Sequence, residues 1–167
     1  MEHNFHPMRR KDRQLDEAEA LALLGKGTYG VLAVVGDEGW PYAVPMNYVL
    51  SNGLLYLHCA KAGYKLDAIR RDARVCFTVV LRDELVPAHI TTLYESVVVQ
   101  GTARIVEDEG EALDALNALV DTLGQVSEEI KTKYIGKKAK NTTLIAIRPL
   151  AVTGKASRVL RPVEERM

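Results

Sequence analysis

The sequence has no net charge, few aromatic residues and only two cysteines. Its 22 lysines and arginines balance its 22 aspartates and glutamates. A neutral chain has no general field that would attract nucleic acid or an anionic membrane surface, and it has few aromatic side chains to stack on bases. We therefore expect no binding to nucleic acid and none to membranes.

Long apolar runs and secretion signals are also missing. The apolar runs are strand-sized, far below the ~20 residues that span a bilayer, and no charged segment followed by a long apolar one stands at the N-terminus. Cys59 and Cys76 lie in apolar, strand-like runs, and no Cys or His pair has zinc-site spacing. These absences predict a cytoplasmic protein without a metal site.

The chain shows no repeat, low-complexity segment or linker that would divide it. Its 167 residues fit one domain of the usual ~100–200 residues. We predict a single domain, 1–167, that begins with a polar arm, 1–14, with a basic cluster at Arg9–Arg13. The arm is either a solvated tail or a segment that reaches a cofactor or a partner subunit.

Alternating apolar residues and short turns predict an antiparallel meander in the first half of the chain. The expected strands are 29–35, 40–50 and 54–60, joined by the turns GDEG and SNG. A mostly apolar strand, 73–81, should be buried on both faces. The charged stretch 82–88 should be a connection.

The second half adds a long β-branched strand and a closing one. The first covers 93–107 and is interrupted by Gly101, where we expect a bulge or a close backbone approach. One or two further strands should lie in 142–160. In all, the pattern predicts six or seven strands.

Helical patterns lie before and between the predicted strands. A D-x-x-E start predicts a helix at 16–24 that ends at Gly25, and further helices are expected at 64–71, 111–123 and 127–134. The leucine stripe of 111–123 indicates core packing. The predicted class is mainly β with α: an antiparallel β-barrel with peripheral helices.

The stretch 41–65 concentrates the candidate chemistry. His58 ends a strand, and AKAGYK follows it, where Gly63 permits close backbone approach and a helix start with Lys65 favours an anion. A strand histidine by itself is more often structural, but this context points to a phosphate-bearing ligand.

The segment VPMNY, 44–48, supplies a second feature. Pro45 removes a ladder donor, which favours an irregular or edge strand. The unpaired backbone groups and the Asn47 amide would then meet the polar rim of a planar heterocycle, with Met46 or an aromatic side chain over its face. A plain edge strand protected by its proline explains the same residues.

These motifs together resemble a known family. GVLAVVGDEGWPYAVPMNY, LYLHCAKAGYK and YESVVVQG occur in order, and in this they resemble the FMN-binding split-barrel proteins related to pyridoxamine 5'-phosphate oxidase, in particular the nitroimidazole-resistance (Nim-type) branch. The resemblance implies a split β-barrel of Greek-key-like antiparallel topology and a homodimer with flavin sites at the subunit interface. The implied cofactor is FMN, with FAD possible and haem as a minor alternative.

The resemblance also assigns residues to the site. The backbone of 44–47 would line the flavin ring, and His58, Gly63 and Lys65 would hold the phosphate end. Two residues on the long strand, Tyr94 and Ser96, would complete a site from the partner subunit. The implied cofactor-binding set is Val44, Pro45, Met46, Asn47, His58, Ala60, Gly63, Lys65, Tyr94 and Ser96.

The implied activity is the reduction of small organic, nitroaromatic-like acceptors, with His58 as the catalytic candidate. The chain lacks the basic cluster of true pyridoxamine-phosphate oxidases, so that activity is not expected. A flavin-binding or haem-binding split barrel without catalysis remains the alternative. His58 either anchors the flavin or acts on the substrate.

Overall fold

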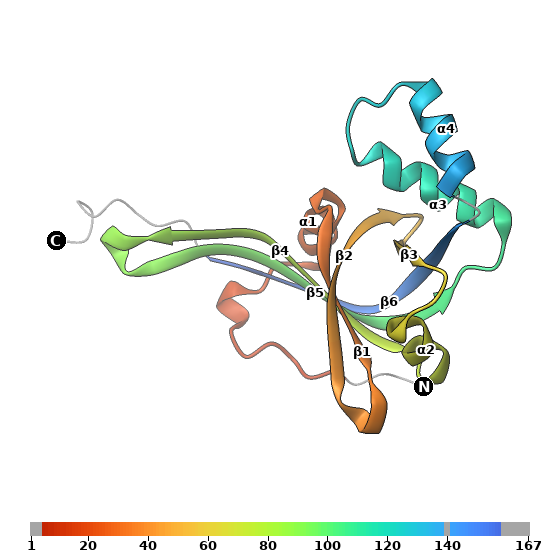
Figure 1. Cartoon of the computed structure of the whole chain (residues 1–167). Coiled ribbons are helices and arrows are strands. Elements are labelled where there is room, and N and C mark those ends of the chain that lie inside the picture. Colours follow the sequence, from red (N-terminus) through yellow and green to blue (C-terminus); the bar gives the residue numbers. More distant parts are fainter. Residues whose placement is uncertain (1–4, 139–140, 158–167) are drawn as a thin grey trace.

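The computed structural model describes residues 5–138 and 141–157, and within them six antiparallel strands form a barrel. The strands follow one another round the barrel in the order β1-β2-β3-β6-β5-β4 (Figure 1). Four α-helices lie outside it. The predicted class, a mainly β split barrel with peripheral helices, is confirmed. Residues 1–4 of the predicted arm and 158–160 of the predicted closing strand lie outside the described residues.

The elements have well-defined bounds. The strands are β1 Tyr29–Val35, β2 Pro41–Ser51, β3 Leu54–Ala60, β4 Arg74–Val86, β5 Thr91–Ile105 and β6 Thr142–Ala156. The helices are α1 Glu17–Lys26, α2 Tyr64–Arg71, α3 Glu109–Asp121 and α4 Glu128–Lys138.

The barrel interior follows from the alternation of the strands. Inward-facing residues of β3, such as Leu55 and Leu57, are fully buried in one cluster with residues from all six strands. Tyr48 and Phe77 meet edge to face inside it, with ring centroids 5.0 Å apart. The Tyr48 hydroxyl donates to the carbonyl of Leu24 at 2.5 Å, which ties α1 to the barrel. Burial raises the pKa of this hydroxyl.

Helix α1 begins as predicted and ends later than predicted. Asp16 and Glu19 form a complete capping box. Gly25 does not stop the helix, which runs to Lys26 with Gly27 as its C-cap. A side chain at Gly27 would collide with the Tyr48 hydroxyl. The glycine required by packing is therefore Gly27.

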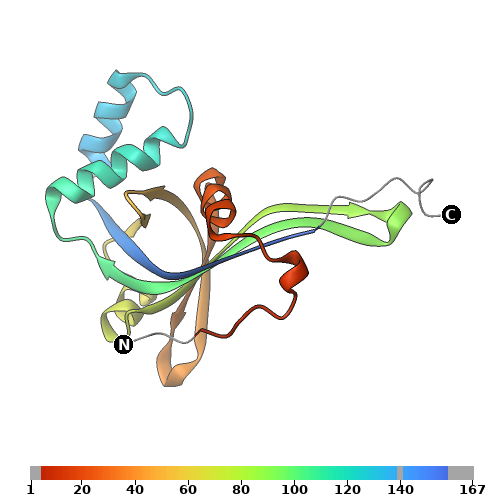
Figure 2. The same cartoon turned by 180° about the vertical axis from the view of Figure 1, so that it is seen from behind.

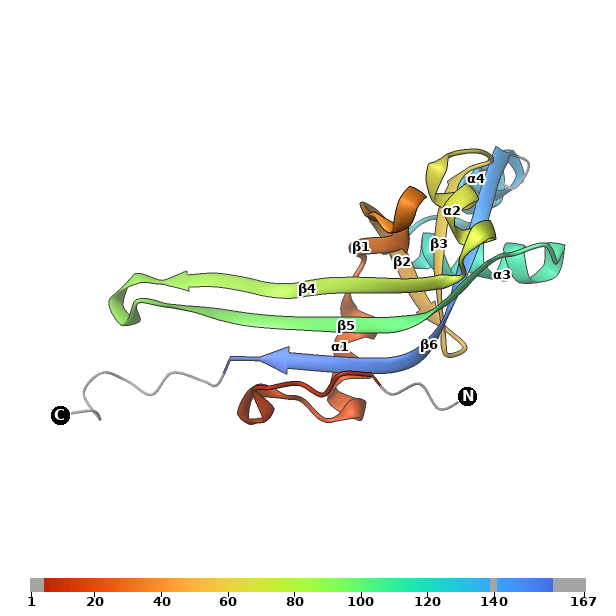
Figure 3. The same cartoon turned by 90° about the horizontal axis from the view of Figure 1, so that it is seen from below.

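Strand β4 departs from its prediction in two ways. Its inward residues Val75, Phe77 and Val79 are buried, but Arg74 and Val80 are exposed, so it is not buried on both faces. The predicted connection 82–88 is mostly strand, because β4 continues to Val86 and pairs with β5. There the strands leave the barrel as a hairpin (Figure 3), where solvent reaches both faces and charged side chains are tolerated.

Gly101 occupies the predicted irregularity. The register between β5 and β6 shifts between Gln100 and Gly101. A Cβ at Gly101 would collide with the carbonyl oxygen of Arg148 on β6. The bulge and the close backbone approach are both confirmed.

The N-terminal segment is attached to the barrel sheet. Leu15 N donates to the Gly154 carbonyl at 3.0 Å, and Gln14 forms an isolated bridge with Lys155 of β6. Figure 3 shows the segment running beside β6. The end of the predicted arm, at Gln14, is therefore not a solvated tail. Among the described residues, no helix is long and apolar enough to cross a membrane.

Candidate functional site

The barrel is split between β2 and β3. Their pairing runs from Ser51 with Leu54 only as far as Tyr48 with Leu57. Beyond that point β2 pairs with β1 alone, and His58–Ala60 of β3 pair with β6 alone. The two strands therefore diverge, and the residues predicted to bind a cofactor stand on both sides of the divergence.

Backbone groups of β2 face this opening. Tyr48 N donates to the Thr28 carbonyl at 3.1 Å, on the β1 side. Because successive residues of a strand point their backbone groups to opposite sides, those of Pro45 and Asn47 point to the side that lacks a strand partner. Pro45 therefore costs no ladder bond, in agreement with the predicted edge strand.

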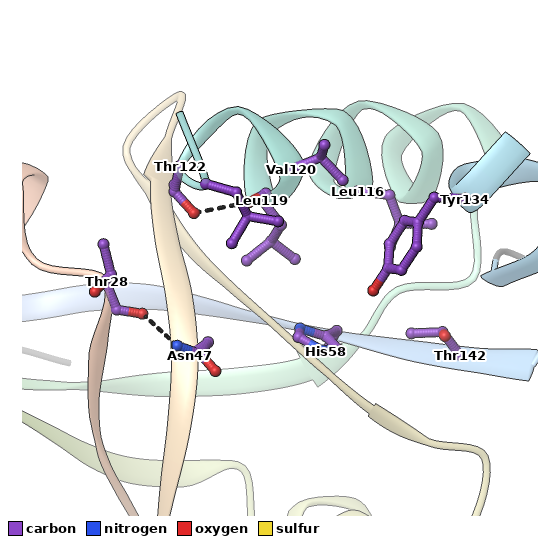
Figure 4. Close-up of a pocket in the computed structure, with 10 residues that line it drawn as sticks. Thr28, Asn47, His58, Leu116, Leu119, Val120, Thr122, Tyr134 and Thr142 are labelled. Carbon is purple, nitrogen blue, oxygen red and sulfur yellow. Dashed lines mark hydrogen bonds between the residues drawn. The ribbon is translucent and has the colours of Figure 1, made fainter. Parts of the chain in front are cut away.

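A pocket of about 260 Å³ lies at the top of the opening, between the barrel rim and α3. In Figure 4 the rim residues Asn47, His58 and Thr142 form a row below the helix, and Tyr134 points its hydroxyl down toward this row. The complete lining is Thr28, Asn47, His58, Leu116, Leu119, Val120, Thr122, Leu123, Tyr134 and Thr142.

Two of the predicted residues, Asn47 and His58, meet in this pocket. Asn47 Nδ2 donates to the Thr28 carbonyl at 3.1 Å, which fixes the amide at the rim. Met46 is buried in the barrel core and so does not cover a heterocycle with its side chain. Val44 packs against the same core.

A polar clamp holds α3 above the pocket. Glu111 accepts from the Tyr56 hydroxyl at 2.8 Å and from Arg104 Nη2 at 2.6 Å. It thereby joins α3 to β3 and β5. The helix pair α3–α4 lies at one end of the barrel, as the view from behind also shows (Figure 2). Burial, together with the hydrogen bond to Glu111, raises the pKa of Tyr56 to about 12. The hydrogen bond from Arg104 lowers the pKa of Glu111. Tyr56 lies two residues before His58, so the clamp sets the position of α3 relative to His58.

The predicted phosphate-binding residues lie in the connection that follows His58. Gly63 has a φ of 145°, which favours glycine, and nothing lies within 4 Å of the position its Cβ would take. Leu66 N bonds to the Gly63 carbonyl at 2.9 Å and starts α2. The N–H groups of Tyr64 and Lys65 precede the first helical bond and are directed outward from the helix start.

Lys65 is half-buried at this helix start, and its charge acts on Cys59. Burial raises the pKa of the Cys59 thiol, and the nearby Lys65 ammonium offsets part of that effect. Ala60, Gly63 and Lys65 do not line the pocket beneath α3. The candidate site thus has two parts, a pocket at Asn47 and His58 and a cationic helix start at Lys65.

Tyr94 and Ser96 lie apart from both parts. Within β5 they belong to the section that leaves the barrel toward the hairpin tip (Figure 3). The Tyr94 backbone bonds with Ser157, and Lys155 Nζ lies 5.4 Å from the centre of the Tyr94 ring. One chain alone does not bring them to the pocket.

Sequence reasoning missed one wall of the pocket. The leucine stripe of α3 predicts core packing alone. Leu116 and Leu119 are buried and line the pocket as well, whereas Leu123 is 73% exposed at its edge. Tyr134 comes from a short helix whose pattern gives no functional signal. Only the position of the α3–α4 pair over the barrel identifies it.

The residues present fit a flavin. A planar ring with a polar rim requires unpaired backbone groups and an amide, and the edge at Pro45 and Asn47 provides both. A flavin phosphate requires a cation and free N–H donors, and the helix start at Gly63 and Lys65 provides them.

Comparison with known proteins also indicates a flavin-binding family. The family model described as pyridoxamine 5'-phosphate oxidase matches residues 16–156. No curated protein matches the chain.

Three solved structures are similar along most of this chain. A proposed 5-nitroimidazole antibiotic resistance protein from Bacteroides thetaiotaomicron is 25% identical, with a TM-score of 0.72 over 92% of this chain and 96% of that one. A FAD-binding protein from Mesorhizobium loti is 24% identical, with a TM-score of 0.65 over 87% and 98%. A FAD and haem binding protein from Mycobacterium smegmatis is 21% identical, with a TM-score of 0.70 over 92% and 78%. The chain belongs to the flavin-binding split-barrel family of pyridoxamine 5'-phosphate oxidase.

Proposed function

We propose that the protein is a flavin-dependent oxidoreductase that reduces small organic acceptors, nitroaromatic compounds among them. The observation that carries this proposal is the shared position of Asn47 and His58. Both belong to the split edge that suits a flavin, and both line the pocket beneath α3. A molecule in that pocket would contact the same residues that contact the cofactor.

Each part of the site has a distinct task in this proposal. Lys65 and the N–H groups after Gly63 bind the flavin phosphate. Ala60, at the end of β3, lies between them and His58 in the chain and contacts the flavin there. The backbone of 44–47 orients the ring. Bound flavin supplies the transfer of an electron pair, with a reduced nicotinamide as the electron source.

His58 is proposed to act on the acceptor. Two-electron reduction of a nitro group to a nitroso group consumes two protons and releases one water. A donor at the pocket rim that delivers one of these protons typically contributes about 10²–10⁴-fold to the rate. His58 is the imidazole in the described pocket lining with that position.

The complete site is proposed to form in a homodimer in the cytoplasm. The β4–β5 hairpin carries exposed apolar side chains, with Leu85 75% and Ile90 96% exposed. If a partner subunit covers this hairpin, Tyr94 and Ser96 of this chain would lie beside the flavin that the partner subunit binds. Both thiols are unpaired, as a reducing compartment requires.

Anaerobic reduction of the FMN-loaded protein tests the proposal. NADH or NADPH should bleach the flavin, and a nitroaromatic acceptor should restore it. His58→Gln should lower kcat/KM by about 10²-fold while FMN binding changes little. Flavin that binds but is never reduced would favour a binding protein without turnover. A large loss of FMN affinity in His58→Gln would make His58 an anchor instead.

A further inference from the structure

A second pocket, of about 770 Å³, adjoins the pocket that His58 lines. Leu116 and Thr142 line both pockets, so the two meet beneath α3. In Figure 4 Asn47, His58 and Thr142 form a row, with Thr142 on the side away from Asn47. This row therefore leads from the first pocket toward the second. We call the two pockets together the α3 groove.

We propose that the α3 groove binds the electron acceptor as an elongated organic anion, with its reducible group at His58 and its carboxylate at Lys61. This rests on the proposed function, because the reducible group must reach the flavin at the rim. It adds the charge and the length of the acceptor to that function.

The register of β3 and β6 connects the two ends of the groove. Directly opposed residues of an antiparallel pair lie on the same face of the sheet. His58 is paired with Leu144, and Ala60 is paired with Thr142. Lys61 follows Ala60 at the end of β3 and lines the second pocket. The face below α3 therefore leads from His58 directly to Lys61.

The middle of the groove is apolar. Leu116 and Leu144 are buried in one cluster that joins α3 to β3 and β6, and Val106 packs against it. The Val106 N–H donates to the Leu144 carbonyl at 2.9 Å, which holds Val106 in this position. A hydrocarbon segment of a ligand would remove apolar surface from water here, which is favourable.

The far end of the groove carries its charges. Lys61 and Glu109 are the charged side chains among the described residues that line the two pockets, and both are exposed. Neither takes part in an ion pair between described residues. Lys61 continues the strand that carries His58, whereas Glu109 lies in the first turn of α3. A ligand that lies along β3 therefore ends at the ammonium, where a carboxylate gains an ion pair.

The chain also limits the length of the ligand. His58 and Lys61 are three residues apart, so their Cα atoms lie at most ~11 Å from each other. A benzene ring with a short methylene chain suits this span. A nitro group and a carboxylate on one ring are too close together to reach both ends.

A matched ligand pair tests the role of Lys61. Equilibrium dialysis of FMN-loaded protein at low ionic strength compares 4-(4-nitrophenyl)butanoate with 4-(4-nitrophenyl)butanamide, which differ only in the charged end. Lys61→Gln should weaken butanoate binding about two- to fivefold, as expected for an exposed ion pair, and leave butanamide binding unchanged. Added salt should remove this difference. Unchanged butanamide binding also shows that the variant is folded.

Two further variants provide a test of opposite sign and a control. Glu109→Gln removes the carboxylate that repels the ligand and should strengthen butanoate binding about twofold. Lys26 of α1 is exposed and lines none of the described pockets. Lys26→Gln should therefore change the binding of neither ligand.

Two further ligands test the length and the sign of the charge. 4-Nitrobenzoate is too short to reach Lys61, so its binding should not respond to Lys61→Gln. 4-(4-Nitrophenyl)butylamine carries the opposite charge and should bind more weakly than the butanoate. A preference for the amine, or an equal response of 4-nitrobenzoate to Lys61→Gln, would overturn the proposal.

The remaining outcomes separate this proposal from the proposed function. A butanoate that does not bind, or that binds equally to Lys61→Gln, would overturn the proposal. Loss of FMN affinity in Lys61→Gln would assign Lys61 to the flavin phosphate and would also overturn it. Charge-dependent binding without reduction by NADH or NADPH would contradict the oxidoreductase and support the groove. Dialysis needs no turnover, so each result is obtained independently.

Discussion

Replacing Lys65 by alanine isolates the phosphate-binding half of the site. Lys65 is half-buried at the start of α2, and no ion pair occupies its ammonium among the ion pairs of the described residues. A charge-assisted hydrogen bond contributes about 1.5–3 kcal/mol. Lys65→Ala should therefore raise the Kd for FMN about 10- to 150-fold.

Riboflavin supplies the matched ligand, because it has the same ring system and no phosphate. Fluorescence titration should show a large loss of FMN affinity in Lys65→Ala and almost no loss of riboflavin affinity. Added salt should reduce the difference, because Lys65 is partly exposed and screened. The exposed Lys137 of α4 provides the control, and Lys137→Ala should bind both ligands as the natural protein does.

Stability of the flavin-free protein provides the second criterion. A substitution outside the core changes the free energy of unfolding by about 0.5 kcal/mol or less, which is about 1–2 °C in Tm for a chain of this size. A fall of more than ~4 °C without flavin would indicate a structural role for Lys65. Equal loss of FMN and riboflavin would refute the phosphate assignment.

Two further substitutions test how the fold supports the site. Glu111→Gln should lower stability by about 1 kcal/mol at pH 7 by weakening the clamp on α3. The pKa of Glu111 is lowered in the folded protein, so this contribution is present above pH 4.5 and is lost as the pH falls through the folded value; a difference in Tm that grows as the pH falls below 4.5 would contradict the clamp. Gly101→Ala should cost about 1–3 kcal/mol in thermal unfolding because its Cβ meets the Arg148 carbonyl. The control Gly136→Ala in α4, with open space around its Cβ, should be stabilising by about 0.5–1 kcal/mol, and equal effects of the two changes would contradict the bulge argument.

Local patterns were enough to predict most of the barrel. The meander β1-β2-β3 and the bounds of α2 follow from alternation, turn residues and helix periodicity, and the structure confirms them. The close approach at Gly101 was predictable because a glycine inside a β-branched strand usually marks a bulge or a close backbone contact.

The errors occurred where tertiary packing overrides local pattern. Gly25 resembles a helix stop, but the helix runs to Lys26, and the glycine that packing requires is its C-cap Gly27, which lies against the Tyr48 hydroxyl. The charged stretch at the end of β4 resembles a loop, but a hairpin exposed on both faces needs no apolar alternation. Neither contact can be inferred from neighbouring residues alone.

The candidate site was predictable only in part, for the same reason. Asn47 and His58 were identified from their own strands, and the fold brings them to one pocket. Tyr134 was missed because it reaches the pocket through the position of a distant helix pair. The assignment of Tyr94 and Ser96 to a partner's site stays a prediction.

The central claim is that the split between β2 and β3 binds a flavin, and the absorption spectrum of the purified protein tests it most directly. After incubation with FMN and removal of free ligand, the protein should retain the absorption bands of oxidised flavin at about one flavin per chain. A protein that stays colourless, or that takes up haem with a Soret band and no flavin, would contradict the account.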